Sequence, residues 1–325
     1  TAADNSYTWH IANGDITDAS KGMSTLLDIV DGFHLPLVGG CDGTNITEAD
    51  PFNASVINNQ STSAHYAYAS IDRAIELIKD PESVEHNLAV MPGIAEESLT
   101  TKLVEACETR ADSMAIIDLP DVYVPPFQES CDNFQERIPE IGNPENSARN
   151  LVNRQLNSSY GATYYPWVKI KDETNNRDVW VPPSVVALGV MGYTENSSDV
   201  WFAPAGFNRG GLNQGNAGVP VLQVTEQLLS KDRDTLYAAN INPIASFVSE
   251  GIVIFGQKTL QSEQSALDRI NVRRLLIFVK KEISRISTSL LFEPNVQATW
   301  ARFHSKAKEL LDSCLLYTSD AADDS

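Results

Sequence analysis

The chain has 325 residues, and its 42% hydrophobic and 21% charged side chains are typical of a soluble globular protein with two or three domains. No run of apolar residues approaches the length of a membrane-spanning helix, so membrane anchoring is not predicted. The formal net charge of −19 is concentrated in residues 1–150, which carry 25 acidic and 7 basic side chains. Residues 151–313 carry 15 acidic and 17 basic side chains. The acidic first half argues against nucleic-acid binding by that half, and the contrast between the halves permits attraction between copies.

Helices and strands alternate along the first half of the chain. Apolar residues at three- and four-residue spacing predict three helices: 67–79, 96–109 and 148–156. Short apolar runs predict four strands: 31–40, 87–91, 113–119 and 162–170. Residues 121–146 are rich in Pro, Glu and Asn and are predicted as an exposed loop. This alternation is typical of an α/β domain with a largely parallel sheet covered by helices, within a mixed α+β chain.

The second half of the chain continues with a strand and a helix over 179–194, where Pro182 and Pro183 suit the first helical turn. A glycine- and asparagine-rich stretch, 206–218, is interpreted as a flexible connection. Strands at 244–248 and 251–256 are predicted to pair across a polar turn.

Two amphipathic helices end the predicted fold. The apolar stripe of the first comprises Val272, Leu275, Leu276, Val279, Ile283 and Ile286. The stripe of the second comprises Val296, Trp300, Phe303, Ala307 and Leu310, with Asn295 as the expected N-cap. Helical periodicity stops near Leu311, and residues 314–325 resemble a translated sequencing adapter, so they are left out of the fold prediction. Each stripe requires a partner surface.

Few residues suggest catalysis. Asp118 follows a predicted parallel strand, where α/β enzymes place catalytic groups, but no basic or nucleophilic partner can be identified. A carboxylate that faces solvent or a helix N-terminus is the interpretation that we favour. Cys41 could act as a nucleophile with His65 as its base, although the sequence does not show that the two meet. The chain is therefore predicted not to be an enzyme.

Metal and cofactor sites are not predicted. The histidines show no HExxH spacing, and Cys41, Cys107 and Cys131 form no CxxC pair, so neither a zinc site nor a disulfide framework is expected. The glycine-rich stretch 206–218 lacks both the GxxxxGK[ST] pattern and a GxGxxG directly after a strand, so it is not predicted to bind phosphate.

Basic residues form one face of the first amphipathic helix: Arg273, Arg274, Lys280, Lys281 and Arg285. Such a run is most often a solvated face. Because the first half of the chain is acidic, these five residues are also the best candidates for an interface with a neighbouring copy.

Four blocks of sequence, in order, resemble the contractile phage tail sheath family. They are GGCDGTNITEADP (39–51); SSYGATYYPWVKI (158–170) with VWVPPSVVALGVMGYT (179–194); WFAPAGFNRGGL (201–212); and INPI through GIVIFGQKTL and INVRRLLIFVKKEIS to LFEPN (241–295). Each motif is modest by itself, but four in one order are specific.

The resemblance implies a structural subunit that polymerises around an inner tube and contracts to drive the tube through a host envelope. It implies other sheath copies, a tail tube protein, and baseplate and tail terminator proteins as partners, and a virion component assembled in the host cytoplasm. Strand exchange between neighbours would hold the copies together. The sheath of a tailocin or a phage-like secretion system is the close alternative, and a soluble α/β hydrolase-like enzyme that uses Asp118 or Cys41 is the alternative of a different class.

The resemblance also suggests how the chain divides. Residues 1–38 are expected to be a remnant of an N-terminal region, 39–256 a central α/β domain and 257–313 a C-terminal domain, followed by the adapter-like tail at 314–325. The family pattern continues at both ends, so the chain is expected to be a fragment whose C-terminal domain lacks its last strands.

Overall fold

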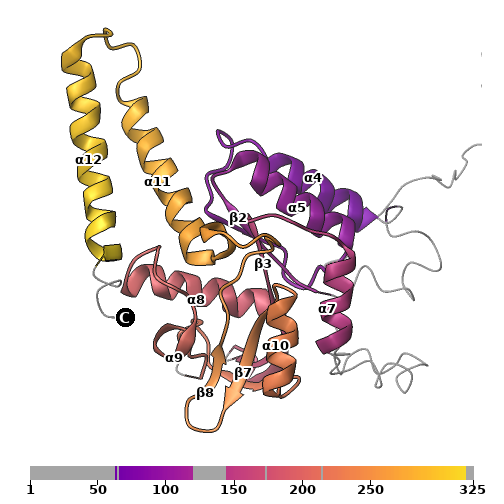
Figure 1. The fold of residues 1–325 in the computed structure, drawn as a ribbon. Coiled ribbons are helices and arrows are strands. Elements are labelled where there is room, and N and C mark those ends of the chain that lie inside the picture. The colour runs from indigo at the N-terminus through magenta and orange to yellow at the C-terminus, as the bar shows by residue number, and fades with distance from the viewer. Residues whose placement is uncertain (1–62, 64–65, 120–143, 173, 214, 320–325) are drawn as a thin grey trace, which may run out of the picture. The chain divides into compact units, whose positions relative to one another are not determined.

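The computed structural model describes residues 63, 66–119, 144–172, 174–213 and 215–319, all within one compact unit, Phe52–Ser325. The expected strand at 31–40 lies outside the described residues, as does most of the expected loop at 121–146. The helices are α4 (Tyr66–Ile78), α5 (Glu97–Arg110), α7 (Pro144–Asn153), α8 (Pro183–Ser197), α9 (Gly206–Arg209), α10 (Ser230–Ala238), a short 3-10 helix η4 (Ala266–Asp268), α11 (Ile270–Thr288) and α12 (Gln297–Ser319) (Figure 1). The strands are β1 (Leu88–Val90), β2 (Met114–Ile117), β3 (Gly161–Tyr165), β4 (Val168–Asp172), β5 (Arg177–Val181), β6 (Val221–Val224), β7 (Asn242–Phe247) and β8 (Gly251–Ile254).

A sheet in the order β1-β2-β3-β7-β8 forms the centre of the fold. Its first four strands are parallel, with Ala115 opposite Gly161 and Tyr164 opposite Asn242. β8 is antiparallel to β7, which confirms the predicted strand pair. Helices connect the parallel strands, so the α/β architecture and the largely parallel sheet are confirmed.

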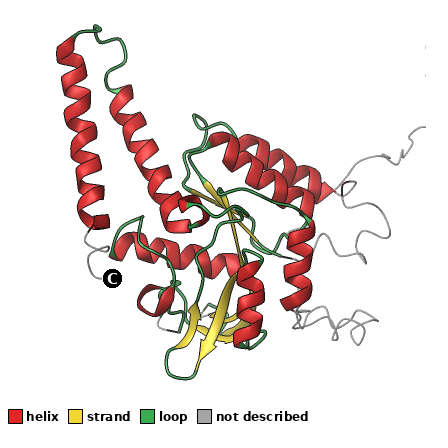
Figure 2. Cartoon of the chain, viewed as in Figure 1, coloured by secondary structure: helices red, strands yellow, loops and turns green. Residues whose placement is uncertain are grey.

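Helices cover both faces of this sheet. Successive side chains of a strand point to opposite faces, so a strand that is apolar throughout needs helices on both sides to bury its side chains. On β2, Met114 and Ile116 belong to the core that α8 and the beginning of α11 complete. Ala115 and Ile117 belong to a second core, to which α4, α5, α7 and α10 contribute. Figure 2 shows helices on either side of the strands.

The predicted strand at 162–170 is wrong in one respect, since it forms two strands in two sheets. β3 ends at Tyr165 and β4 begins at Val168. Pro166 lies between them, and proline has no N–H to donate to a neighbouring strand. β4 becomes the middle strand of a second, antiparallel sheet in the order β5-β4-β6.

Several helix ends differ from the predicted ones. α7 begins at Pro144 instead of residue 148, since proline suits the first turn of a helix. α12 begins at Gln297, so its N-cap position falls on Val296, and Asn295 accepts the indole N–H of Trp300 instead. The same helix continues to Ser319, past the expected end at residue 311 and across the expected boundary at 313, with Cys314 buried.

The glycine-rich stretch corrects the prediction of a flexible connection. α9 opens it, and the following residues run along the outer edge of β8, where the Ile254 N–H donates to the Gly210 oxygen at 2.9 Å and the Leu212 N–H donates to the Ile252 oxygen at 2.8 Å. A Cβ atom on Gly210 would lie 2.8 Å from the Ile254 oxygen, so the approach requires glycine. The stretch therefore covers a sheet edge that would otherwise be open to pairing.

Candidate inter-subunit interface

Two of the five predicted interface residues, Arg273 and Arg274, face the body of their own chain. Arg273 is 7% exposed, donates to the Ser159 hydroxyl and places its guanidinium carbon 4.0 Å from the ring centroid of Tyr160. Arg274 is 4% exposed and donates to the Glu195 carboxylate at 2.9 Å. Burial lowers the pKa of Arg274, and the charge of Glu195 opposes this change.

These contacts correct the predicted apolar stripe of α11. Its buried residues are Ile270, Arg273, Arg274 and Ile277, whereas Leu276 of the stripe is 43% exposed. An arginine covers apolar surface with its stem and can be buried when its guanidinium finds partners. Apolar periodicity cannot register this possibility, so it misses the two buried arginines. The other residues of the predicted stripe are half-buried: Val272, Leu275, Val279, Ile283 and Ile286.

The other three basic residues bind the end of α5 and the loop before β1. Lys280 donates to the carbonyl oxygens of Arg110 and Ala111, at 3.2 and 3.1 Å, where the negative end of the helix dipole lies. Lys281 donates to the His86 oxygen at 2.7 Å. Arg285 pairs with Glu85 at 2.8 Å and with Glu282 at 2.7 Å, and its side chain stays 62% exposed.

All five cations therefore anchor α11 within its own chain. That they also contact a neighbouring copy stays a prediction, and it depends chiefly on the exposed Lys280 and Arg285. The anchored helix supports α12, which packs against it as an antiparallel hairpin (Figure 1).

Asp118 occupies the position at a helix N-terminus that we favoured over catalysis. It is 1% exposed, and its carboxylate accepts the Ser184 N–H at 3.2 Å, the Ser184 hydroxyl at 2.7 Å and the Gly93 N–H at 3.0 Å. Burial raises the pKa of Asp118, and these hydrogen bonds oppose the rise. Since Ser184 lies in the first turn of α8, the carboxylate satisfies a helix N–H group that would otherwise lack a partner.

The remaining chemical candidates are not brought together in the part of the chain that the structure describes. Cys41, His65 and Cys131 lie outside it. Cys107 is buried in α5, which raises the pKa of its thiol. Among the described residues no group of three His, Cys, Asp or Glu side chains could hold a metal ion, and none of the helices combines the length and hydrophobicity that a membrane span requires.

The turn between α11 and α12 presents an apolar surface that periodicity did not predict. We call residues 290–296 the hairpin tip. Phe292 is fully exposed and Leu291 is 62% exposed. Phe292 also has a φ of +66°, which is an outlier for a bulky residue. Only the apolar residues of the LFEPN block hinted at this surface in the sequence.

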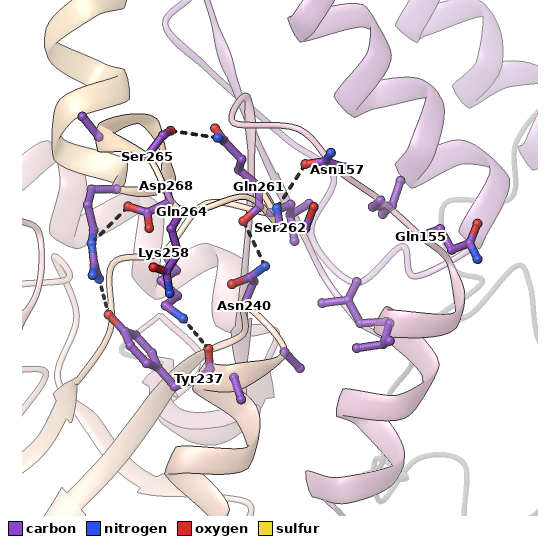
Figure 3. A pocket seen from close by; sticks show the side chains of 18 residues that line it. Gln155, Asn157, Tyr237, Asn240, Lys258, Gln261, Ser262, Gln264, Ser265 and Asp268 are labelled. Carbon is purple, nitrogen blue, oxygen red and sulfur yellow. Dashed lines mark hydrogen bonds and ion pairs between the residues drawn. The ribbon is translucent and has the colours of Figure 1, made fainter.

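A pocket of about 1010 Å³ lies between the C-terminal ends of α7 and α10 and residues 258–269; we call it the α7–α10 pocket. Leu151, Leu156, Leu260 and Ala266 supply apolar wall. Figure 3 shows polar side chains around the same opening, with Lys258 directed toward Tyr237. The chain elements that form it are far apart in sequence, so spacing could not reveal it.

Lys258 is the least compensated charge of this pocket. Its ammonium donates to the backbone carbonyl oxygen of Tyr237 at 2.9 Å and lies 4.2 Å from the Tyr237 ring centroid. Burial and the nearby Arg269 lower the pKa of Lys258, and Asp268 opposes this change from beside Arg269, with which it pairs at 3.2 Å. Lys258 itself has no carboxylate within 4.0 Å among the described residues.

Comparison with known proteins addresses what these surfaces serve. No family model matches the sequence. The chain is 31% identical to the tail sheath protein of Vibrio phage KVP40 over 241 residues, which cover 71% of this chain and 35% of that protein. It is 29% identical to the tail sheath protein of Enterobacteria phage T4 over 259 residues, which cover 77% of this chain and 38% of that protein.

A solved structure shares the fold. It is the sheath complex of an extracellular contractile injection system, PVC, in the contracted state, with a TM-score of 0.52 and 22% identity over 73% of this chain and 57% of that chain. The chain therefore spans little more than a third of the curated relatives and somewhat more than half of the structural one.

Proposed function

Since this chain belongs to the contractile phage tail sheath family, we propose that it forms part of a subunit that polymerises around an inner tube and contracts to drive the tube through a host envelope. The observation that carries the proposal is the alignment with tail sheath proteins over 71% of the chain. The fold shared with a contracted injection-system sheath supports it, and for the same reason the sheath of a tailocin or a phage-like secretion system is the second candidate.

The proposed role is mechanical and not enzymatic. Asp118 was a candidate for catalysis because of its position after a strand. Its buried carboxylate instead accepts hydrogen bonds from Ser184 and Gly93 and serves a helix N-terminus. Contraction would instead come from a change between two packings of neighbouring subunits. Such a change needs rigid subunits with surfaces that join copies, not a reactive group.

The proposed partners follow from this role. They are further copies of the sheath, a tail tube protein, and baseplate and tail terminator proteins, in a virion assembled in the host cytoplasm, without nucleic-acid binding or membrane anchoring. A central domain over 39–256 and a C-terminal domain over 257–313 form part of the same proposal.

We further propose that the basic helix contributes to contacts between copies. Arg273, Arg274 and Lys281 would hold α11 in place, while Lys280 and Arg285 would offer charge to acidic side chains of a neighbour. Exposed pairs of this kind are weak singly and sensitive to salt, so they would direct association more than they would strengthen it.

Sedimentation velocity over a wide range of protein concentration tests the proposed function. We expect the weight-average sedimentation coefficient of the full chain to rise with concentration, and to rise less in high salt. A chain that sediments as a monomer throughout would contradict self-assembly. Turnover of a hydrolase substrate that disappears in Asp118→Asn would instead favour the enzymatic alternative.

A further inference from the structure

We propose that the α7–α10 pocket receives the hairpin tip of a second copy of this chain, with Glu293 of the tip beside Lys258 of the pocket. The inference rests on the proposed function and deepens it, because it identifies one contact through which sheath subunits would join. The argument combines the exposed surface of the tip, the shape and charge of the pocket, and the distance between them.

The tip has the character of a binding element. Phe292 is fully exposed and Leu291 is 62% exposed, at the end of a hairpin where no packing requires apolar side chains. Phe292 lies in the turn that the Glu293 N–H closes on the Leu290 carbonyl oxygen at 3.2 Å, and its φ of +66° costs a bulky residue backbone free energy. Outliers of this kind concentrate where a residue binds a partner.

The pocket complements the tip in shape. Its volume of about 1010 Å³ accommodates several side chains, and its walls combine leucine and alanine side chains with amides and hydroxyls. A convex turn with two adjacent apolar side chains and a rigid proline, Pro294, is the kind of projection that such a concave site can enclose.

The charges are complementary as well. Lys258 and Arg269 line the pocket with Asp268 as the acidic residue between them, which leaves one positive charge in excess. Glu293 is exposed beside Phe292 and forms no ion pair with the described residues. Insertion of Phe292 into the apolar wall would bring this carboxylate to the half-buried ammonium of Lys258.

Tip and pocket of one copy cannot meet. Arg269 lines the pocket and is followed directly by α11, which runs for 19 residues before the tip. A helix of that length spans about 28 Å. The contact must therefore form between copies, and it joins two different surfaces. Such a head-to-tail contact extends into rings or helical tubes instead of closing as a dimer.

A charge exchange between two full-length variants tests the contact. Glu293→Lys places two cations together in every contact, and Lys258→Glu places two carboxylates together. We expect each variant alone to associate at least about tenfold more weakly than the wild type, the change that corresponds to ~1.4 kcal/mol. An equimolar mixture restores association, because each tip then meets a pocket of opposite charge.

The controls distinguish loss of the proposed contact from a general effect of net charge and from misfolding of a variant. Glu309→Lys and Lys308→Glu, both on α12, make the same charge changes at exposed sites away from the tip and the pocket lining, and they should leave association within about twofold of the wild type. Near-ultraviolet circular dichroism checks that Lys258→Glu folds. Phe292→Ser, at a fully exposed position, removes the apolar contact without altering charge and should weaken association comparably.

The outcomes are distinct. If the wild type associates and Glu293→Lys and Phe292→Ser associate equally well, the contact is overturned while the proposed function stands. If the mixture fails to restore association that each variant has lost, the pairing of Glu293 with Lys258 is overturned. A wild type that is monomeric at every concentration overturns both proposals.

Discussion

Arg274 of α11 and Glu195 of α8 form an ion pair of 2.9 Å in which the arginine is 4% and the glutamate 44% exposed. The two residues are 79 positions apart, and they connect the helical hairpin to the helix that covers the central sheet. The asymmetry of their burial has energetic consequences, since the arginine cannot recover its hydration if its partner is removed.

Glu195→Gln is expected to destabilise the fold more than Arg274→Met does. The first variant leaves a buried guanidinium without a counter-charge, at a cost of about 2 kcal/mol. The second replaces the arginine with an apolar side chain and leaves a glutamate that water can solvate, so it should cost less than ~1 kcal/mol. Urea unfolding measures both free energies. A larger loss for Arg274→Met would show that the arginine contributes through other contacts.

Asp118→Ala is expected to lower the free energy of unfolding by about 2–4 kcal/mol, because it leaves the buried N–H and hydroxyl of Ser184, and the N–H of Gly93, without their acceptor. Asp118→Asn, which retains one acceptor oxygen, should lose less. Asp234→Ala removes an exposed carboxylate from α10 and serves as the control, with a change within ~0.5 kcal/mol. Equal losses for Asp118→Ala and Asp234→Ala would contradict the role at the helix N-terminus.

Gly189 and Gly192 of α8 should respond in opposite directions to alanine. A Cβ atom on Gly189 would lie 2.1 Å from the Ala217 oxygen, so Gly189→Ala must displace backbone and should cost at least ~2 kcal/mol. Gly192 has nothing within 4 Å of the same position, and Gly192→Ala should stabilise the helix by about 0.5–1 kcal/mol. Thermal unfolding of the two variants decides the point. A tolerated Gly189→Ala would place α8 farther from the 217 segment.

His86 predicts a loss of stability in mild acid. Burial lowers its pKa from the ordinary value of 6.5, and the cations of Arg110 and Lys281 act in the same direction while Asp112 opposes them. The unfolded chain therefore binds a proton at His86 near pH 6.5, whereas the folded chain binds it only at lower pH. The stability that comes from the neutral imidazole is present above pH 6.5 and is lost as the pH falls through the lowered pKa.

His86→Gln should flatten the dependence of unfolding free energy on pH below 6.5, whereas His304→Gln, at an exposed position on α12, should leave it unchanged. Urea titrations at a series of pH values provide the measurement. An identical pH profile for His86→Gln and the wild type would show that the imidazole is not what makes the fold sensitive to acid.

Local pattern predicted most of the elements. The helices α4 and α5 bury apolar residues at three- and four-residue spacing. The strands β1 and β2 are short apolar runs, and α8 begins at the predicted pair of prolines. Prediction failed where a distant residue changed the outcome. Arg273 and Arg274 are buried because Ser159, Tyr160 and Glu195 receive them, and no local pattern contains those partners.

By itself the sequence determined the α/β architecture, the alternation of its helices and strands and, through four ordered motifs, the sheath family, since each depends on residues close together in the chain. The tertiary structure alone decided which face of α11 is buried, that Asp118 serves the first turn of α8, and that residues 258–269 join α7 and α10 around a pocket. These features depend on burial and partners that only the folded chain brings within contact, and they include the pocket that we propose receives the hairpin tip of a second copy.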